Sequence, residues 1–177
     1  LNNKEKLSDI SAQKDEKTIN DLSSQIIKLG DKPNLDNKDQ KGLIKDLSKQ
    51  LEQLNVQNIL KDKSKNKIKD EKINGINVRF QTVEGLPPKD LRKLVDQGKK
   101  DLVEGLIIVF ASQDNKVGLA IGITEKLTTK YDAVKFAKLG SEITGGKGGG
   151  GRKDFAQAGG QDVSKIGDAL KRIKELI

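Results

Sequence analysis

The sequence predicts an α+β protein in two parts: an N-terminal antiparallel helical hairpin of coiled-coil type over residues 1–72, and a small α/β domain over residues 73–177. Three observations predict this fold class. Residues 1–72 carry apolar side chains at alternating spacings of three and four, which is helical periodicity. From Ile73 onward, apolar residues first alternate with polar ones in the period of a strand. Two continuous apolar runs, LIIVFA (106–111) and VGLAIGI (117–123), then indicate buried strands.

Two narrow apolar seams define the predicted hairpin. They consist of Ile19, Leu22, Ile26 and Leu29 in the first arm and of Ile44, Leu47, Leu51 and Leu54 in the second. This spacing is that of a coiled-coil seam. The connector over residues 30–42 has glycine at both ends, Pro33, and several Asp and Asn residues, all of which stop helices. We therefore expect the chain to reverse there, and we interpret the lysine-rich stretch 61–69 as a solvated helix end.

The second part is predicted to run β-α-β-β-α-loop-α, with a sheet of three strands or slightly more. Pro87 and Pro88 open its first helix, because proline is tolerated in a first turn. The helix expected over about residues 132–144 presents small residues that permit close packing on the sheet. The last helix follows Asp162, a favourable N-cap, and its apolar positions are Val163, Ile166, Leu170, Ile173 and Ile177.

The composition excludes most catalytic chemistries. The 177 residues include no Cys and no His, which removes disulfides, thiol nucleophiles, imidazole bases and the usual zinc ligands. The carboxylates are scattered among lysines as surface charge, so no catalytic residue, metal ligand or cofactor is predicted. Leu1 and the lack of any Met indicate a fragment of a longer protein. The chain has no signal-peptide core and no membrane-spanning run, which favours a cytoplasmic location.

A net charge of +8 indicates an anionic partner. When the chain is divided at the predicted boundary, residues 1–72 carry 16 basic and 13 acidic groups, and residues 73–177 carry 18 and 13. The excess is thus spread along the sequence, and only local clusters of charge indicate a site.

The most unusual segment is GGKGGGGRKDFAQAGG, residues 145–160, a glycine-rich basic loop. It satisfies the dinucleotide pattern G-x-G-x-x-G only because it is a run of glycines, and a helix precedes it where the fingerprint needs a strand. A P-loop is excluded as well, because Lys147 is not followed by Ser or Thr. Two interpretations remain: a loop that lets a nucleic-acid backbone approach three cations, or a mobile surface loop. Since aromatics are few, any RNA readout would concern shape and backbone.

The same segment resembles the signature near the C-terminus of alanyl-tRNA synthetases, which is usually GGKGGGRPDMAQAGG. The upstream strings LPPKDLRKLVDQGKK, LIIVFAS and KVGLAIGIT follow the order and lengths seen in the Asp-His-His-associated domain of those enzymes. The resemblance covers about residues 75–177. It departs from the family in one extra glycine within 148–151, and in Lys153 and Phe155, where Pro and Met are usual.

The resemblance implies a C-terminal part of an alanine–tRNA ligase that is non-catalytic in isolation and holds no cofactor. In the family, this part grips the elbow of the transfer RNA, assists aminoacylation and editing, and often mediates dimerisation. The expected partners are therefore tRNA, the remainder of the parent synthetase, and a second copy bound through the hairpin. The RNA-binding candidates are Lys147, Gly148, Gly149, Gly150, Gly151, Arg152, Lys153 and Gln157.

Two other functions are compatible with the sequence. The hairpin could make the chain a dimerisation or structural module whose contact with RNA is incidental. Related domains also accompany phosphodiesterases, where a glycine-rich loop holds the phosphate of the substrate, so an accessory substrate-binding role is the other alternative.

Overall fold

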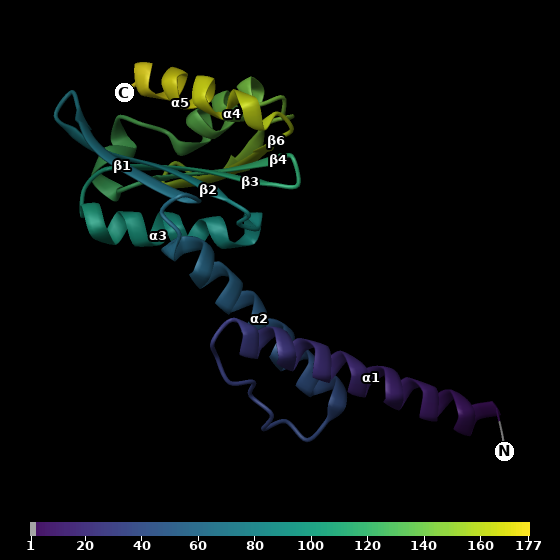
Figure 1. Cartoon of the computed structure of the whole chain (residues 1–177). Coiled ribbons are helices and arrows are strands. Elements are labelled where there is room, and N and C mark those ends of the chain that lie inside the picture. Colours follow the sequence, from purple (N-terminus) through teal and green to yellow (C-terminus); the bar gives the residue numbers. More distant parts are fainter. Residues whose placement is uncertain (1–2) are drawn as a thin grey trace. The chain divides into compact units, whose positions relative to one another are not determined.

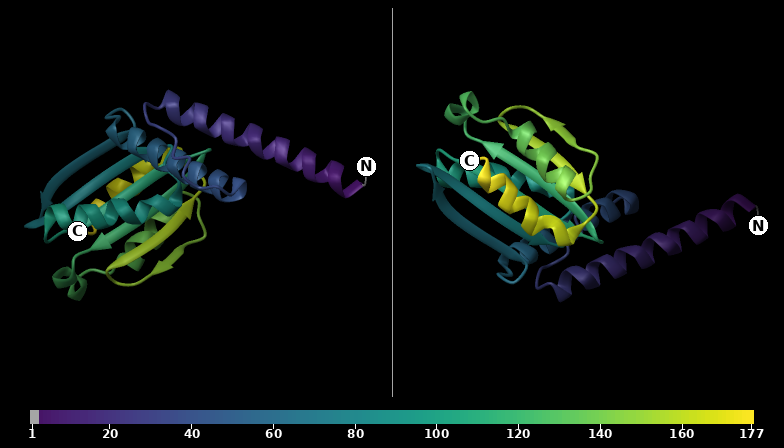
Figure 2. Two further views of the ribbon diagram at one scale, coloured as in Figure 1. Left: turned by 90° about the horizontal axis from the view of Figure 1, so that it is seen from below. Right: turned by 90° about the horizontal axis from the view of Figure 1, so that it is seen from above.

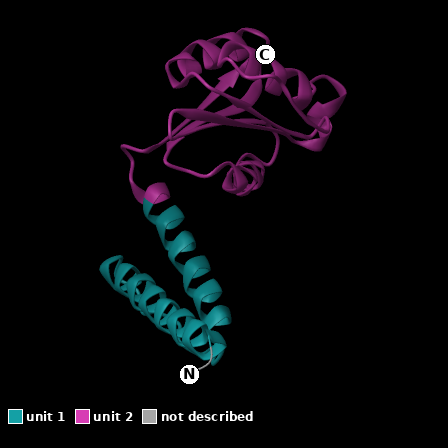
Figure 3. Ribbon diagram, turned by 90° about the vertical axis from the view of Figure 1, so that its right-hand side faces the viewer, with its two compact units in different colours: residues 1–58 teal, residues 59–177 magenta. Residues whose placement is uncertain are grey.

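The computed structural model describes residues 3–177 (Figure 1). The chain forms two compact units, residues 1–58 and residues 59–177 (Figure 3). The sequence predicts a boundary after residue 72, whereas the two units of the structure divide between Asn58 and Ile59, inside a helix. Within residues 3–177, no helix is both long and apolar enough to cross a membrane.

The first unit contains helix α1 (Asn3–Lys28) and most of helix α2 (Gln40–Lys61), as the predicted hairpin requires. Helix α1 ends at Lys28 and is followed by Gly30, whose φ of 86° lies in the left-handed region that glycine adopts without strain. The amide of Asp31 then donates to the carbonyl of Ile26 at 3.2 Å, which satisfies a helix-end acceptor. Asp39 caps the next helix, because its side chain accepts from the amide of Gly42 at 2.8 Å.

Burial in this unit is partial along both arms of the hairpin. Of the eight predicted seam residues, only Ile26 and Leu47 are fully buried. Gln50 fixes the connector on α2, since its Nε2 donates to Oδ2 of Asp31 at 2.9 Å and its Oε1 accepts from the amide of Asn34 at 3.0 Å. The connecting segment is therefore held by polar contacts, and the other six seam residues are half-buried.

The second unit is built on one six-stranded sheet. Its strands are β1 (Asn66–Ile73), β2 (Ile76–Glu84), β3 (Leu106–Gln113), β4 (Lys116–Ile123), β5 (Gly149–Gly151) and β6 (Phe155–Gly160). Their spatial order is β1-β2-β3-β4-β6-β5, and all neighbours are antiparallel except β2 and β3. Two hairpins close on residues with positive φ, Asn74–Gly75 and Asp114–Asn115, whose turns match the twist of the strands.

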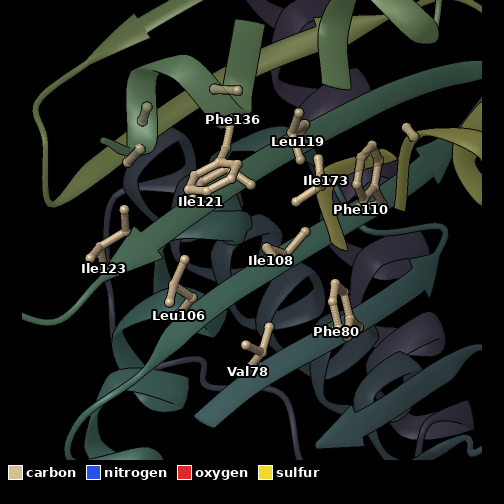
Figure 4. Close-up of a cluster of buried hydrophobic side chains, with 14 of the residues drawn as sticks. Val78, Phe80, Leu106, Ile108, Phe110, Leu119, Ile121, Ile123, Phe136 and Ile173 are labelled. Carbon is tan, nitrogen blue, oxygen red and sulfur yellow. The ribbon is translucent and has the colours of Figure 1, made fainter. Parts of the chain in front are cut away.

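Helices cover both faces of this sheet. Helix α3 (Leu91–Leu102) packs on β3 and β4 from one side, whereas α4 (Ala133–Ile143) and α5 (Ile166–Glu175) lie on the other side (Figure 2). The larger core lies under α4 and α5, where β3 and β4 contribute alternate residues such as Ile108 and Ile121, which face each other across the strands (Figure 4). The period-2 pattern of the sequence thus decides which side chains face which helices.

The structure corrects two details of the predicted topology. The stretch 61–69 is only in part a helix end, because β1 begins at Asn66 and forms an edge strand. Its alternating lysines are exposed, as is common on sheet edges, which proteins protect with charge. The predicted loop 145–160 contains β5 and β6, so that the sheet has six strands. Both strands escaped prediction because β5 is all glycine and β6 has Phe155 as its only residue of the bulky β-branched and aromatic kinds that usually mark strands.

One ion-pair cluster joins three elements on the α3 side of the sheet. Arg79 of β2 donates from Nε and Nη2 to the carboxylate of Asp70 on β1, at 2.8 and 2.9 Å. Its Nη1 donates to Oδ2 of Asp101 on α3 at 2.6 Å, and Gln97 donates to the other oxygen of Asp101 at 2.7 Å. These hydrogen bonds from Arg79 lower the pKa of both Asp70 and Asp101. The edge strand is therefore tied to α3 through a single guanidinium group.

We expect Arg79→Met to lower the free energy of unfolding by about 1 kcal/mol at neutral pH, a modest loss because the paired carboxylates are partly screened by solvent. The lowered carboxyl pKa values stabilise the wild type fully above the unfolded-state pKa of about 4, and this stabilisation is lost as the pH falls through the lower folded-state values. Urea unfolding across that acid range should show the two proteins converging. A difference that stayed constant with pH would show that these pairs do not stabilise the fold.

Candidate nucleic-acid interface

The glycine-rich segment is an ordered hairpin at one edge of the sheet. Strand β6 pairs with β4 on one side and with β5 on the other. Arg152 and Phe155 close the turn between the two strands: the amide of Arg152 donates to the carbonyl of Phe155 at 2.7 Å, and the reverse bond measures 3.3 Å. The segment is therefore part of the sheet, and the interpretation as a mobile surface loop does not fit it.

Close packing explains why this hairpin is made of small residues. A Cβ atom at Gly149 would overlap the backbone of Gln157 and the side chain of Ala158 on the paired strand. A Cβ atom at Gly160 would overlap Thr144, which follows α4. Helix α4 contacts β4, β5 and β6, and any side chain larger than Ala on its side of the hairpin would push it away.

A buried serine fastens α4 to both sides of the hairpin. The hydroxyl of Ser141 donates to the carbonyl of Gly159 at 2.6 Å and accepts from the amide of Gly148 at 3.0 Å. Ser141 is fully buried, so both of these bonds are shielded from water. A Cβ atom at Gly146 would overlap the same hydroxyl and the same carbonyl. Gly146 is thus required by the approach of α4, and Gly149 by the close pairing of β5 with β6.

The structure distributes the predicted site residues along the hairpin. Gly149, Gly150 and Gly151 form β5, with Lys147 and Gly148 before it and Arg152 and Lys153 after it. Lys147 and Arg152 therefore lie at opposite ends of β5, and the three predicted cations are not gathered at one point. Gln157 lies in β6, where its Nε2 donates to the carbonyl of Pro88 at 2.8 Å and so positions the start of α3.

Arg152 and Lys153 instead meet two lysines from α3. A groove of about 710 Å³, which we call the basic groove, lies between the C-terminal end of α3, the C-terminal end of β4 and the turn of the β5–β6 hairpin. Its lining consists of Lys99, Lys100, Val103, Ile123, Thr124, Glu125, Thr128, Arg152, Lys153 and Asp154. Four cations and two hydroxyl groups face two carboxylates, which is a composition suited to an anion with several oxygen atoms.

Asp154 holds two of these cations in place. Lys99 donates from Nζ to the carbonyl of Asp154 at 2.9 Å, and its Nζ lies 3.9 Å from the carboxylate Oδ2. Arg152 Nε lies 3.2 Å from the other carboxylate oxygen. Lys100 and Lys153 are exposed, and neither forms an ion pair within residues 3–177. The groove thus presents two cations that Asp154 holds and two that have no ion-pair partner among the described residues.

A strained turn forms part of the groove wall. Val103 has a φ of 61° and a ψ of −49°, and the amide of Glu104 donates to the carbonyl of Leu102 at 2.6 Å across it. This is a γ-turn with positive φ, which is rare for a β-branched residue. Strain of this kind recurs at functional sites. Here it places an apolar side chain, 81% exposed, beside four cations.

Sequence reasoning missed Lys99 and Lys100 as site residues. They lie more than fifty positions before Arg152, and only the pairing of β4 with β6 brings the two segments together. The sequence feature that could have identified them is the Gly98-Lys99-Lys100 triplet at the end of an amphipathic helix. A Cβ atom at Gly98 would lie 2.7 Å from Cγ1 of Ile107, so glycine lets the last turn of α3 lie against the sheet.

The charge excess lies wholly in the second unit. Residues 59–177 carry 24 basic and 16 acidic groups, whereas residues 1–58 carry ten of each. Moving the boundary from residue 72 to residue 58 therefore assigns all eight excess positive charges to the unit that holds the basic groove. An anionic partner would be attracted to this unit.

Comparison with known proteins places this unit in a family. The family model of the DHHA1 domain matches residues 75–177, which include strands β2 to β6 and all three helices that cover the sheet. The chain belongs to the DHHA1 domain family. No group of three or more metal-binding side chains that could hold an ion occurs in the part of the chain that the structure describes.

Relatives of this DHHA1 domain include alanine–tRNA ligases. The chain is 43% identical over 108 residues to that of Parvibaculum lavamentivorans, and 48% identical over 106 residues to that of Rhodopseudomonas palustris. These matches cover 60% and 59% of the chain, but only 12% of each ligase. The fold is similar to the C-Ala domain of alanyl-tRNA synthetase from Aquifex aeolicus, with a TM-score of 0.58 and 27% identity over 61% of this chain and 96% of that one.

The glycine strand offers a direct test of its role. We expect Gly149→Ala to lower the free energy of unfolding by about 1–3 kcal/mol, because the new methyl group overlaps β6. Gly150→Ala is the matched control: no atom lies within 4 Å of its Cβ position, so stability should change by less than about 1 kcal/mol. Thermal unfolding measures both. Equal stability of the two variants, with RNA binding reduced in both, would instead favour a phosphate cradle built on bare backbone.

Proposed function

We propose that the chain is the tRNA-binding C-terminal part of an alanine–tRNA ligase, non-catalytic by itself, which assists aminoacylation and editing by the rest of the enzyme. The observation that carries this proposal is the basic groove, because it gathers Lys99, Lys100, Arg152 and Lys153 from two distant segments of a DHHA1 domain. The names of the relatives supply the substrate class, since they are ligases of alanine and tRNA.

The groove fits the backbone of a folded RNA. A run of phosphates carries closely spaced negative charges, which match several cations within one depression. Lys100 and Lys153, which have no ion-pair partner within residues 3–177, can each meet a phosphate without first breaking an internal contact. The hydroxyl groups of Thr124 and Thr128 already donate to the carbonyls of Gly105 and Glu125, at 3.3 and 2.6 Å, so the donors left for phosphate oxygens are the cations. We propose that this surface meets the elbow of tRNA, where the backbone folds on itself.

The remaining sequence candidates take supporting roles in this proposal. Lys147 lies at the other end of β5 and would reach a separate phosphate. Gly149 and Gly151 let β5 lie close against β6 and so hold the turn that carries Arg152 and Lys153. Gln157 positions the start of α3. The expected partners are tRNA and the other domains of the parent ligase, in the cytoplasm.

Binding of tRNA should depend steeply on salt. For each phosphate contact, the logarithm of the affinity should fall by about 0.7–0.9 per logarithmic unit of salt. Replacing Lys100 and Lys153 together with Ala should weaken the binding of an alanine tRNA transcript at least tenfold at low salt and reduce the salt slope by about 1.4–1.8. Titrations by fluorescence anisotropy at several salt concentrations measure both quantities.

The matched control removes two other exposed lysines, Lys135 and Lys138 on α4, and so changes the net charge equally. It should leave the salt slope close to that of the wild type. A Lys147→Ala variant reports whether the far end of β5 touches the RNA. If both double variants weakened binding equally, net charge alone would account for it and the groove would lose its role.

A second candidate function, dimerisation, is favoured by helix α1. Leu7 and Ile10 lie three residues apart on this helix and are 67% and 62% exposed, and so form an apolar pair open to another helix. A second copy could supply that helix.

Light scattering should then report a dimer at tens of micromolar, and replacing both residues with Gln should give a monomer. Ile27→Gln, a change at another exposed apolar residue of α1, is the control and should leave the dimer intact. A monomeric wild type at that concentration contradicts dimerisation through α1, whatever the result of the tRNA titration.

A further inference from the structure

One aromatic side chain stands apart from the core. The chain has four Phe and one Tyr, and four of these five rings are buried among other apolar residues: Phe80, Phe110, Phe136 and Tyr131. Phe155 is only half-buried and does not belong to that cluster. It lies on β6 opposite Gly122 of β4, and so faces the α3 side of the sheet, away from the main core.

A guanidinium group covers this ring. The Cζ atom of Arg92, near the start of α3, lies 5.1 Å from the centroid of Phe155, which is within cation–π distance. The side chain of Arg92 is itself 61% exposed, and its only ion pair within residues 3–177 is a 4.0 Å contact with Asp96. The planar guanidinium is thus held over the ring while much of its surface remains open to solvent.

This stack adjoins the basic groove along two elements. Along β6, Phe155 directly follows Asp154, which holds Lys99 and Arg152. Along α3, Arg92 and Lys99 are seven residues apart, two helical turns on the same face, about 10 Å. The stack and the groove are therefore near enough for one RNA segment to contact both.

We propose that Arg92 and Phe155 form a stacking platform for a nucleobase of the RNA whose phosphates occupy the basic groove. This inference rests on the function proposed above. Aromatic rings and Arg guanidinium planes are the surfaces on which proteins stack unpaired or terminal bases. The neighbouring cations select a nucleic acid over an uncharged apolar occupant. The platform gives the DHHA1 domain a contact to a base plane, in addition to the backbone contacts of the groove.

The lack of tryptophan in the chain allows a direct test. In Phe155→Trp, the only indole of the protein stands on the platform, and binding of the alanine tRNA transcript should quench its fluorescence strongly. Leu176→Trp is the matched control, because Leu176 is 52% exposed and follows α5 on the opposite face of the sheet. Its fluorescence should change several-fold less. Inorganic polyphosphate, which has no bases, should quench neither variant.

Two further variants separate stacking from charge. Phe155→Leu should weaken tRNA binding roughly fivefold or more, and Arg92→Lys should do the same although it keeps the positive charge, because an ammonium group has no plane on which a base can stack. In both variants the salt slope should match the wild type, since no phosphate contact is lost. Circular dichroism at the binding temperature checks that both remain folded.

The outcomes distinguish this inference from the function on which it rests. Suppose that the wild type binds tRNA in a salt-dependent manner, but that the indole of Phe155→Trp is not quenched and that Phe155→Leu and Arg92→Lys bind like the wild type. Arg92 and Phe155 then only tie α3 to β6, and the platform is overturned. If the wild type does not bind tRNA, the proposed function fails first and the platform fails with it. Equal quenching of the two indole variants would indicate non-specific association and would also overturn the platform.

Discussion

The fold of the second unit depends on how closely the end of α4 approaches the edge of the sheet. Ser141 donates to the carbonyl of Gly159 and accepts from the amide of Gly148, and it is fully buried while doing so. Such a contact is possible only where the facing strands carry almost no side chain. The short strand β5 is thereby held against β6, although three glycines have little intrinsic tendency to form a strand.

This constraint also positions the chemistry of the site. Because β5 and β6 are held, the turn between them places Arg152 and Lys153 opposite the last turn of α3. Asp154 then acts as an internal counter-ion that orients Lys99 and Arg152 before any ligand arrives. Pre-orientation of this kind reduces the side-chain entropy that binding must otherwise remove. In the proposed tRNA site, the glycines act indirectly, through the position of their neighbours.

The sequence predicted the main elements but not the edges of the sheet. Helices and central strands were readable, because the burial of residues such as Ile108 or Leu119 follows from continuous apolar runs. Strand β1 was not predicted from the sequence. An edge strand needs little burial, and the lysines of β1 alternate as they would on any solvated segment. Strand β5 carries no side-chain signal at all. Arg152 and Lys153 were named as candidate site residues from the sequence. Finding Lys99 and Lys100 requires knowing which strands pair, and a local sequence pattern does not contain that information.

The all-glycine strand β5 limits which amino-acid substitutions this surface can accept. A side chain at Gly149 or Gly151 would overlap β6, so variation at these two positions is blocked by packing whatever its effect on a ligand, whereas Gly150 has no atom within 4 Å of its Cβ position. The flanking positions 147, 152 and 153 are exposed and carry no such restriction. New partners can therefore be selected through Gly150 and the residues on either side of the strand. Gly148, which precedes β5, has a φ of 95°, so a side chain there would strain the backbone although no atom lies within 4 Å of its Cβ position.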